Sequence, residues 1–325
     1  MLKNQTITAY FSTIEWHKEN IVDWASAGEF KSLNGDEGQL GQYHYSYFNA
    51  AITSEDGVYA FIYSRLATKG LLLKNGELIR EINRSYYCAD TYEYPAAFVT
   101  AQGKTYLAHC PKKYCQLDFE DVETGEIITD TKDRKPSDFF HSVMSVSPDG
   151  KYLLVRGWAW HPVESFQVFS VEDCFKNPLL LDDMPFFYNF GMEINSASFI
   201  DDEHILVASS DDEPFNDENP TGLPPKHIAV WNFKTNKLST PIKAPKDTGN
   251  FFAINYQLAW DMYKYPKLIN IETGQIIDHI EDINSGLQNS SIYTSVDKCP
   301  QIKFNKSTGK IAVLTAEGCI NVLSI

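Results

Sequence analysis

The sequence lacks the segments that would direct it into or across a membrane. No run of about 18 apolar residues occurs, so we expect no membrane-spanning helix. The first residues, MLKNQTITAYFS, contain no apolar segment of signal-peptide length after a basic start. The six cysteines form no CxxC pair and have no histidine at zinc-finger spacing. We therefore expect a cytoplasmic protein with reduced thiols and no contact with a membrane.

Common catalytic and metal-binding motifs are also missing. The chain has no GxSxG, no HExxH and no phosphate-binding glycine loop. Residues 210–222, SDDEPFNDENPTG, lack the spacing of a calcium loop, and His161 is more typical of a packing residue than of a general base. Cys110 and Cys115 leave a metal site or a hairpin disulfide open as less favoured alternatives. We expect no catalytic residue, no metal and no cofactor.

Basic residues are scarce compared with acidic ones. The chain has 28 Lys and Arg residues against 43 Asp and Glu residues, which gives a net charge of -15. This charge disfavours binding to nucleic-acid phosphates and to anionic lipid surfaces. A protein with a basic surface is the natural complement, and the alternative is that the charge only maintains solubility.

A repeated hairpin pattern is what the sequence does contain. Residues 142–160, SVMSVSPDGKYLLVRGWAW, are apolar on both sides of Pro148-Asp149-Gly150, which is strong turn chemistry. The pattern recurs, with turns near Glu19, Gly57, Gly103, Gly150, Glu203, Tyr256 and Gly309. Second hairpins follow, with turns at Gly76, Gly125, Asn236 and Gly274. Four short strands in units of roughly 40 to 50 residues are typical of β-propeller blades.

The repeats predict one all-β domain over residues 1–325, a seven-bladed β-propeller. Six blades are the alternative, but they would leave an N-terminal segment that matches the repeat outside the ring. The chain after Gly309 can supply two further strands but not three. Residues 6–12, TITAYFS, have strand composition. We expect them to join the last blade and close the ring, which removes an open sheet edge.

Two segments resemble the WD-repeat β-propeller family. HIAVWNF, residues 227–233, is similar to the third-strand motif of that family, with Trp231-Asn232 in place of Trp-Asp. SVSPDGKYLLV resembles the first hairpin of the repeat. The resemblance covers nearly the whole chain, although no blade begins with the Gly-His pair of the family. It implies a degenerate WD-repeat-like propeller, a fold that serves many unrelated functions.

The connections predict that the two ends of the propeller differ. Turns within the first and last hairpins of each unit are short, and they define the short-turn end. The second-to-third loops and the links between blades are long, and they define the long-loop end, where function is expected. Aromatic rings and carboxylates there are typical of protein-binding surfaces, although the rings could instead pack between blades. The predicted partner-binding residues are Trp158, Trp160, His161, Phe187, Tyr188, Asp211, Asp212, Asp217 and Tyr263.

The leading functional hypothesis is a non-enzymatic, protein-binding propeller that is a monomer on its own. It would be a scaffold, a regulatory protein or a bacterial immunity-type protein that captures a partner with a basic surface on the long-loop end. The alternative is a hydrolase or lyase that acts on a sugar or small ester in the central funnel. Inward-pointing carboxylates and histidines around one ion would favour the enzyme.

Overall fold

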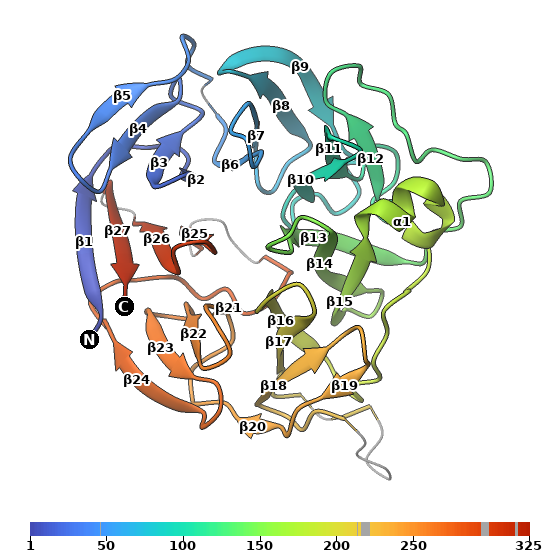
Figure 1. The fold of residues 1–325 in the computed structure, drawn as a ribbon, viewed down its shortest axis with the longest axis vertical. Coiled ribbons are helices and arrows are strands. Elements are labelled where there is room, and N and C mark those ends of the chain that lie inside the picture. The colour runs from blue at the N-terminus through green and yellow to red at the C-terminus, as the bar shows by residue number, and fades with distance from the viewer. Residues whose placement is uncertain (46, 213, 216–221, 294–298, 316–317) are drawn as a thin grey trace.

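The strands form seven antiparallel sheets in a ring, as the computed structural model shows (Figure 1). The structure describes residues 1–45, 47–212, 214–215, 222–293, 299–315 and 318–325. Each sheet is one blade, and we number the blades 1 to 7 along the chain. The predicted seven-bladed β-propeller is confirmed, and the predicted hairpin turns fall between strands or directly after them.

Blades 1 and 2 have the four strands that the repeat predicts. Blade 1 contains β2 (Glu15–His17), β3 (Asn20–Asp23), β4 (Glu29–Ser32) and β5 (Glu37–Gln39). Blade 2 contains β6 (Ala50–Thr53), β7 (Tyr59–Tyr63), β8 (Lys69–Lys74) and β9 (Glu77–Asn83). Positive φ at the turns explains their glycines, because Gly57 at 75° and Gly76 at 79° adopt a conformation that other residues rarely tolerate.

Blades 3 and 4 depart from the prediction of four strands each. Blade 3 contains β10 (Ala96–Ala101), β11 (Lys104–His109) and β12 (Asp118–Asp121). Blade 4 contains β13 (Phe139–Val146), β14 (Tyr152–Ala159) and β15 (Val163–Ser170). In blade 3 the expected fourth strand makes a single bridge, from Ile127 to Glu120, among the described residues. The repeat pattern was therefore wrong for the outer strand of both blades.

A helix follows β15 where the fourth strand of blade 4 was expected. Helix α1 (Val171–Lys176) begins after Ser170, whose side chain accepts a hydrogen bond from the backbone N–H of Asp173. Glu172 and Asp173 lie in its first turn, where negative charge suits the helix dipole. The 3-10 helix η1 (Pro178–Leu181) comes next. These capping signals were present in the sequence and outweigh its apolar pattern.

Blades 5, 6 and 7 complete the ring. Blade 5 contains β16 (Ile194–Phe199), β17 (His204–Ser209), β18 (His227–Asn232), β19 (Lys237–Leu238) and β20 (Ile242–Lys243). Blade 6 contains β21 (Phe251–Ala253), β22 (Leu258–Asp261), β23 (Lys267–Asn270) and β24 (Gln275–His279). Blade 7 contains β25 (Gln301–Asn305), β26 (Lys310–Leu314) and β27 (Cys319–Ser324), with β1 (Lys3–Thr8) on its outside.

The N-terminal strand closes the ring as predicted. Strand β1 pairs antiparallel with β27, from Lys3 opposite Ser324 to Thr8 opposite Cys319. The prediction of residues 6–12 placed the strand too late in the chain. The reason is that Ala9 and Phe11 are buried between blades 7 and 1, where they belong to the link into β2.

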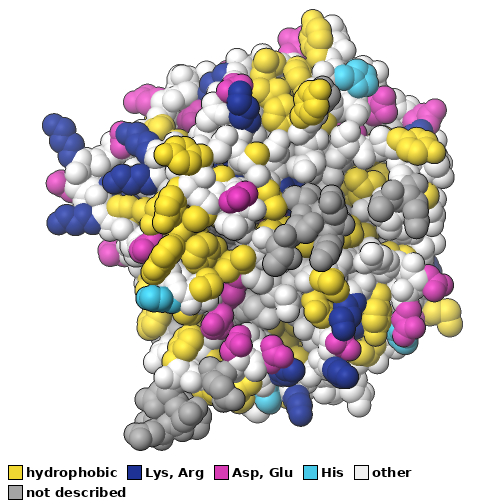
Figure 2. All heavy atoms as spheres, turned by 180° about the vertical axis from the view of Figure 1, so that it is seen from behind, with side chains coloured by type: hydrophobic (Ala, Val, Ile, Leu, Met, Phe, Trp, Pro, Cys, Tyr) yellow, Lys and Arg dark blue, Asp and Glu magenta, His cyan; other side chains and the backbone are white. Residues whose placement is uncertain are grey.

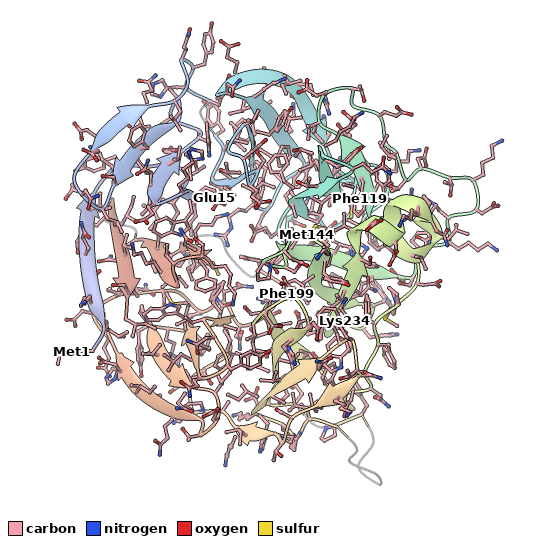
Figure 3. All side chains as sticks on the ribbon, viewed as in Figure 1. Met1, Glu15, Phe119, Met144, Phe199 and Lys234 are labelled. Atoms are coloured by element: carbon pink, nitrogen blue, oxygen red, sulfur yellow. The ribbon has the colours of Figure 1, made fainter. Side chains whose placement is uncertain are left out.

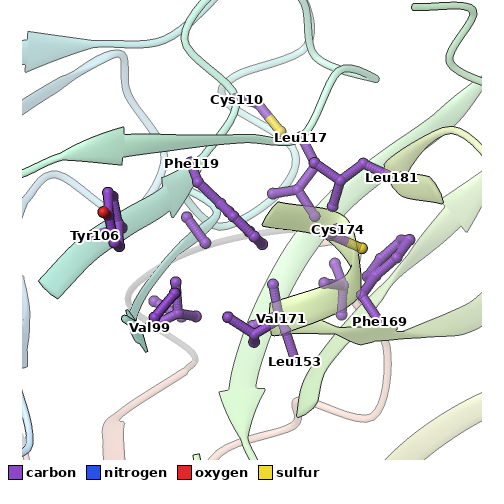
Figure 4. Close-up of a cluster of buried hydrophobic side chains, with 14 of the residues drawn as sticks. Val99, Tyr106, Cys110, Leu117, Phe119, Leu153, Phe169, Val171, Cys174 and Leu181 are labelled. Carbon is purple, nitrogen blue, oxygen red and sulfur yellow. The ribbon is translucent and has the colours of Figure 1, made fainter. Parts of the chain in front are cut away.

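The hydrophobic core is divided into layers between neighbouring blades. Between blades 3 and 4, for example, Phe119 and Val99 pack with Leu153 and Phe169 (Figure 4). Helix α1 adds Val171 to the same layer. Each blade thus depends on both of its neighbours for burial of its faces.

None of the helices in the described residues has the length and apolar character to cross a membrane.

Removal of Met1–Ser12 tests the ring closure. We expect a melting temperature lower by at least about 5 °C and a tendency to associate, because the edge of β27 loses its partner. Thermal unfolding followed by circular dichroism, together with size-exclusion chromatography, measures both effects. A synthetic peptide of residues 1–12 should restore the stability in part. An unchanged melting temperature in a monomeric truncated protein would contradict the closure argument.

Candidate functional site

The long-loop end carries an apolar patch with acidic side chains near it. Figure 2 shows this face, with hydrophobic side chains gathered on the side of the ring that contains blades 3 and 4. Several exposed rings belong to segments at this end, among them Tyr86 and Tyr87 in the link from β9 to β10 and Trp160 between β14 and β15. The patch therefore includes segments from more than one blade.

A continuous stack of five rings lies under this patch, and we call it the aromatic ladder: Tyr87, Tyr114, Phe140, Trp158 and Trp160. Ring centroids are 5.0 Å apart for Tyr87 and Tyr114, and 4.2 Å apart for Tyr114 and Phe140. Phe140 and Trp158 are 3.7 Å apart with an interplanar angle of 4°. Trp160 lies 6.3 Å from Trp158.

Strand register explains why these rings meet. Phe140 on β13 and Trp158 on β14 are directly opposite each other in the antiparallel pair, which places their side chains on the same face of the blade. Trp160 follows Trp158 by two residues and therefore continues the same face. Tyr87 and Tyr114 come from other segments and extend the stack sideways. The ladder thus rises from the blade core to the surface.

The two tryptophans that the sequence predicted as contact residues differ in burial. Trp158 is 6% exposed and Trp160 is 50% exposed. The second-to-third loops were predicted to be long, but in blade 4 β14 and β15 leave only residues 160–162 between them. Trp158 therefore supports Trp160 from below and contributes little contact area of its own. Its predicted role in partner binding stays a prediction.

A buried arginine holds the link that carries Tyr87. Arg84 donates hydrogen bonds to the backbone oxygens of Ala89 and Tyr92 at 2.8 and 2.9 Å. Its guanidinium also lies 4.4 Å from the ring centroid of Tyr92, close enough for a cation–π interaction. Such contacts fix the shape of the loop, so Tyr87 occupies a defined position beside Tyr114. The sequence contained no signal for this role of Arg84.

Carboxylates accompany the ladder. The hydroxyl of Tyr114 donates a hydrogen bond of 2.5 Å to Asp138, which is exposed. Asp90 is a second exposed carboxylate, in the same link as Tyr87. Rings with carboxylates at their edges suit a ligand that combines apolar surface with positive charge.

Other predicted contact residues lie elsewhere on the molecule or are partly buried. Phe186 packs against Tyr152 and Phe233 near the short-turn end, so the structure does not bring the exposed Phe187 together with Trp160. Tyr188 is half-buried and packs against Phe190, with ring centroids 4.9 Å apart. The sequence treated the link between blades 4 and 5 as one surface loop, whereas Phe186 and Tyr188 in this link pack along the blades.

Four of the remaining predicted residues lie in loops of the long-loop end. His161 is exposed at the tip after β14 and has a φ of 100°. Asp211 and Asp212 are exposed, and Asp211 forms an ion pair of 2.9 Å with Lys226. Tyr263 is half-buried after β22. Asp217 lies outside the described residues.

The central channel is the second candidate site. It contains a cavity of about 390 Å³ lined by residues from several blades, and Glu15, Met144 and Phe199 lie around the centre of the ring (Figure 3). Tyr293, in the link from β24 to β25, also lines this cavity. Its hydroxyl accepts a hydrogen bond from Arg65 and donates one to Glu93, each 2.8 Å long.

The same link crosses the channel at the long-loop end. Ser291 donates two hydrogen bonds to the carboxylate of Glu164 on β15, and its carbonyl oxygen accepts one from Ser142 on β13. Ile292 forms a bridge with Tyr92, in the link between blades 2 and 3. Residues 291–293, in the link between blades 6 and 7, therefore contact blade 4 and the link between blades 2 and 3.

The chemistry expected of a metal-dependent funnel enzyme is not found in the described ranges. No group of three or more His, Cys, Asp or Glu side chains in these ranges is placed to hold a metal ion. Cys110 is buried and Cys115 is half-buried, and the two are not joined by a disulfide. The cavity in the channel instead has more cationic side chains than carboxylates in its lining.

Comparison with known proteins supports the fold. No model of a protein family matches the sequence, and no curated protein matches it. A chain of the mitotic checkpoint complex crystal structure superimposes with a TM-score of 0.62 at 9% identity, covering 99% of this chain and 91% of that chain. The Pan2 WD40 domain of Neurospora crassa gives 0.58 at 10% identity, covering 96% and 88%. BamB from Moraxella catarrhalis gives 0.56 at 11%, covering 100% and 98%.

These likenesses place the chain among seven-bladed β-propellers whose fold is similar to that of WD40 and other propeller proteins. At such low identity they concern the fold alone. The expected resemblance to degenerate WD repeats is confirmed at the level of structure.

The two tryptophans should differ sharply in their effect on stability. Trp158→Ala removes a buried ring from a packed stack and should destabilise the fold by about 3 to 5 kcal/mol. Trp160→Ala removes a half-exposed ring and should change stability by no more than about 0.5 kcal/mol. Urea unfolding of both variants measures the difference. An equal change in the free energy of unfolding for both variants would contradict the assignment of Trp158 to the core and Trp160 to the surface.

His141 should make the protein sensitive to acid. Burial lowers its pKa to about 4, below the ordinary value of 6.5. The unfolded chain therefore binds a proton that the folded chain does not bind as the pH falls from about 6.5 to about 4, and stability is lost over this range. The loss should reach about 3 kcal/mol. In His141→Gln, urea unfolding between about pH 7 and pH 4.5 should show a smaller loss than in the wild type.

Proposed function

We propose that this protein is a binding propeller that captures another protein through the exposed rungs of the aromatic ladder. The observation that carries this proposal is the stack of rings that leads from the buried Phe140 to the half-exposed Trp160. A large ring held rigidly on a packed base offers contact area without the entropy cost of ordering a flexible side chain. Such rings are typical of binding hot spots.

The partner in this proposal presents basic side chains. Lys and Arg side chains pack their stems and charged groups on aromatic faces, and the carboxylates of Asp90 and Asp138 lie in the segments that carry ladder rings. The net charge of -15 adds long-range attraction for such a partner. The expectations of a monomeric, cytoplasmic protein and of a scaffold, regulatory or immunity-type role stay predictions from the sequence.

Fold similarity is consistent with this proposal. The propellers with similar structure include one solved within a mitotic checkpoint complex. A rigid ring with elaborated loops at one end is a common platform for protein recognition.

Substitution of Trp160 tests the proposed function. A partner is first isolated from the native lysate on the immobilised protein and then purified, and its affinity is measured by calorimetry. Trp160→Ala should weaken binding by roughly 2 kcal/mol or more, because a central ring would lose its contact. Tyr256→Ala is the matched control, since Tyr256 is 48% exposed in the first hairpin turn of blade 6, at the short-turn end.

The outcomes are distinct. Loss of affinity in Trp160→Ala with normal affinity in Tyr256→Ala supports the ladder as the binding surface. Loss only in Tyr256→Ala would move the site to the short-turn end. A partner that binds both variants as tightly as the wild type would reject both surfaces.

A further inference from the structure

The cavity in the channel has an excess of positive charge, which contrasts with the acidic chain as a whole. Its lining includes four cationic side chains and two carboxylates: Arg65, Arg156, Lys303, Lys306, Glu15 and Glu93. Two of the cations are compensated. Lys303 forms an ion pair of 2.8 Å with Glu15, and Arg65 lies 3.7 Å from Glu93 and is linked to it through Tyr293.

Arg156 is the exception among the arginines of the cavity. It is 8% exposed and makes one hydrogen bond in the described part of the chain, of 3.3 Å from Nη2 to the backbone oxygen of Asn195. No carboxylate among the described residues lies within ion-pair distance of it. Because a guanidinium carries five N–H donors, most of its donor capacity is unused. Burial accordingly lowers the pKa of Arg156 from its usual value.

Among the carboxylates, Glu164 has the largest charge interaction with Arg156. Its oxygens, however, accept hydrogen bonds from other groups. They accept hydrogen bonds from Ser290 and from the backbone and side chain of Ser291. Burial raises the pKa of Glu164, while these hydrogen bonds and the charge of Arg156 act in the opposite direction. A buried cation without a close partner is unfavourable unless a further group completes the site.

The two innermost strands beside Arg156 both bulge at its level. On β13 the register shifts between His141 and Met144, so that residues 142 and 143 lie opposite Arg156 of β14. On β16 the register shifts between Ile194 and Ser196, at the residue whose backbone accepts the hydrogen bond from Arg156. Bulges of this kind redirect side chains and are frequent beside binding sites. Arg156 therefore lies beside two irregular strand segments, one in blade 4 and one in blade 5.

A second unused polar group belongs to the bulge of β16, on the residue whose backbone oxygen contacts Arg156. The side-chain oxygen of Asn195 is buried and has no hydrogen-bond partner in the described structure. Ser142, Asn250 and Gln288 also line the cavity and offer neutral hydrogen-bonding groups. A ligand there would meet a charged fork and several neutral donors and acceptors. The volume of about 390 Å³ lies within the usual range for small-molecule pockets.

We propose that the channel binds a small organic anion whose carboxylate or phosphate group is held by Arg156, between the bulges of β13 and β16. Carboxylates and phosphates match the planar fork of a guanidinium with two parallel hydrogen bonds. Ser142 and Asn250, which line the cavity, then contact hydroxyl or amide groups of the same ligand. This site is separate from the aromatic ladder and does not depend on the proposed protein partner.

Lys306 marks the other end of the cavity. Its ammonium donates hydrogen bonds of 2.9 and 2.7 Å to the backbone oxygens of Phe199 and Ala253, and burial lowers its pKa to about 8. Its donors are used by the backbone, so it contributes charge to the cavity without a vacant fork. Arg156 is therefore the residue that selects the anion, and Lys306 supports it at a distance.

Calorimetric titration of the full chain with sodium phosphate and, separately, sodium citrate tests this site. The wild type should bind at least one of these anions at a single site. Arg156→Gln should bind it roughly tenfold or more weakly, because the charged fork is lost. Lys69→Gln, which changes an exposed cation on blade 2, is the matched control and should bind like the wild type. The tighter of the two anions identifies the phosphate or the carboxylate class.

Thermal unfolding supplies a second measure. In anion-free buffer Arg156→Gln should melt at the same temperature as the wild type or higher, because an uncompensated buried charge is removed. Phosphate and citrate stabilise many proteins by exclusion from their surfaces, so the difference between variants is the informative quantity. The anion should raise the melting temperature of the wild type more than that of Arg156→Gln.

Arg156→Lys separates charge from geometry. It retains the positive charge without the planar fork, and we expect roughly threefold or greater weakening of anion binding. This variant decides the matter if Arg156→Gln does not fold. Failure of both anions to bind the wild type, or equal affinity for wild type and folded Arg156 variants, would overturn the proposal. A lower melting temperature of Arg156→Gln with unchanged affinity would assign Arg156 a structural role instead.

Discussion

Pairing between β1 and β27 is the constraint on which the whole ring depends. Every layer of core lies between two blades. A ring that is open at one point therefore leaves two blades with only one neighbour each, and one apolar face of each blade is uncovered. The pair joins residues 3–8 to residues 319–324 and thereby connects the two ends of the chain. The positions of the ladder and of the channel cavity both follow from this closure, because each uses side chains from blades held at fixed spacing.

The two candidate sites use the same scaffold in different ways. The aromatic ladder extends outward from a cross-strand pair in blade 4, and its rigidity comes from the packing of rings on one another. The channel cavity lies where innermost strands converge, and the link through Tyr293 fastens it at one end. One site therefore offers a surface and the other an enclosed space, and each can be changed without the other.

The sequence predicted the ring well because turn chemistry is local. Gly57, Gly150 and Gly309 require positive φ, and their spacing revealed the blades. The outer strands of blades 3 and 4 were predicted wrongly, since short apolar segments after β12 and β15 do not distinguish a strand from a capped helix. The local turn pattern therefore predicted the number of blades better than the number of strands in each blade.

The sites were predicted less well, since they depend on contacts between distant segments. Trp160 was identified by its position near a turn, but the stacking of Trp158 on Phe140 follows from strand register, which the sequence did not reveal. Arg156 was overlooked, because a single arginine in an apolar strand carries no motif. Its significance comes from what surrounds it: two bulges and a carboxylate engaged elsewhere.

The composition of β1 has a consequence for how the chain is made. This strand precedes all seven blades along the chain, whereas its partner β27 is the last strand of blade 7. At roughly 5 to 20 residues per second, β1 waits for tens of seconds without a partner. Its sequence, KNQTIT, is polar and almost wholly exposed even in the finished ring. A nascent strand of this kind has little tendency to aggregate, so the protein can delay its closing step until β27 has been synthesised.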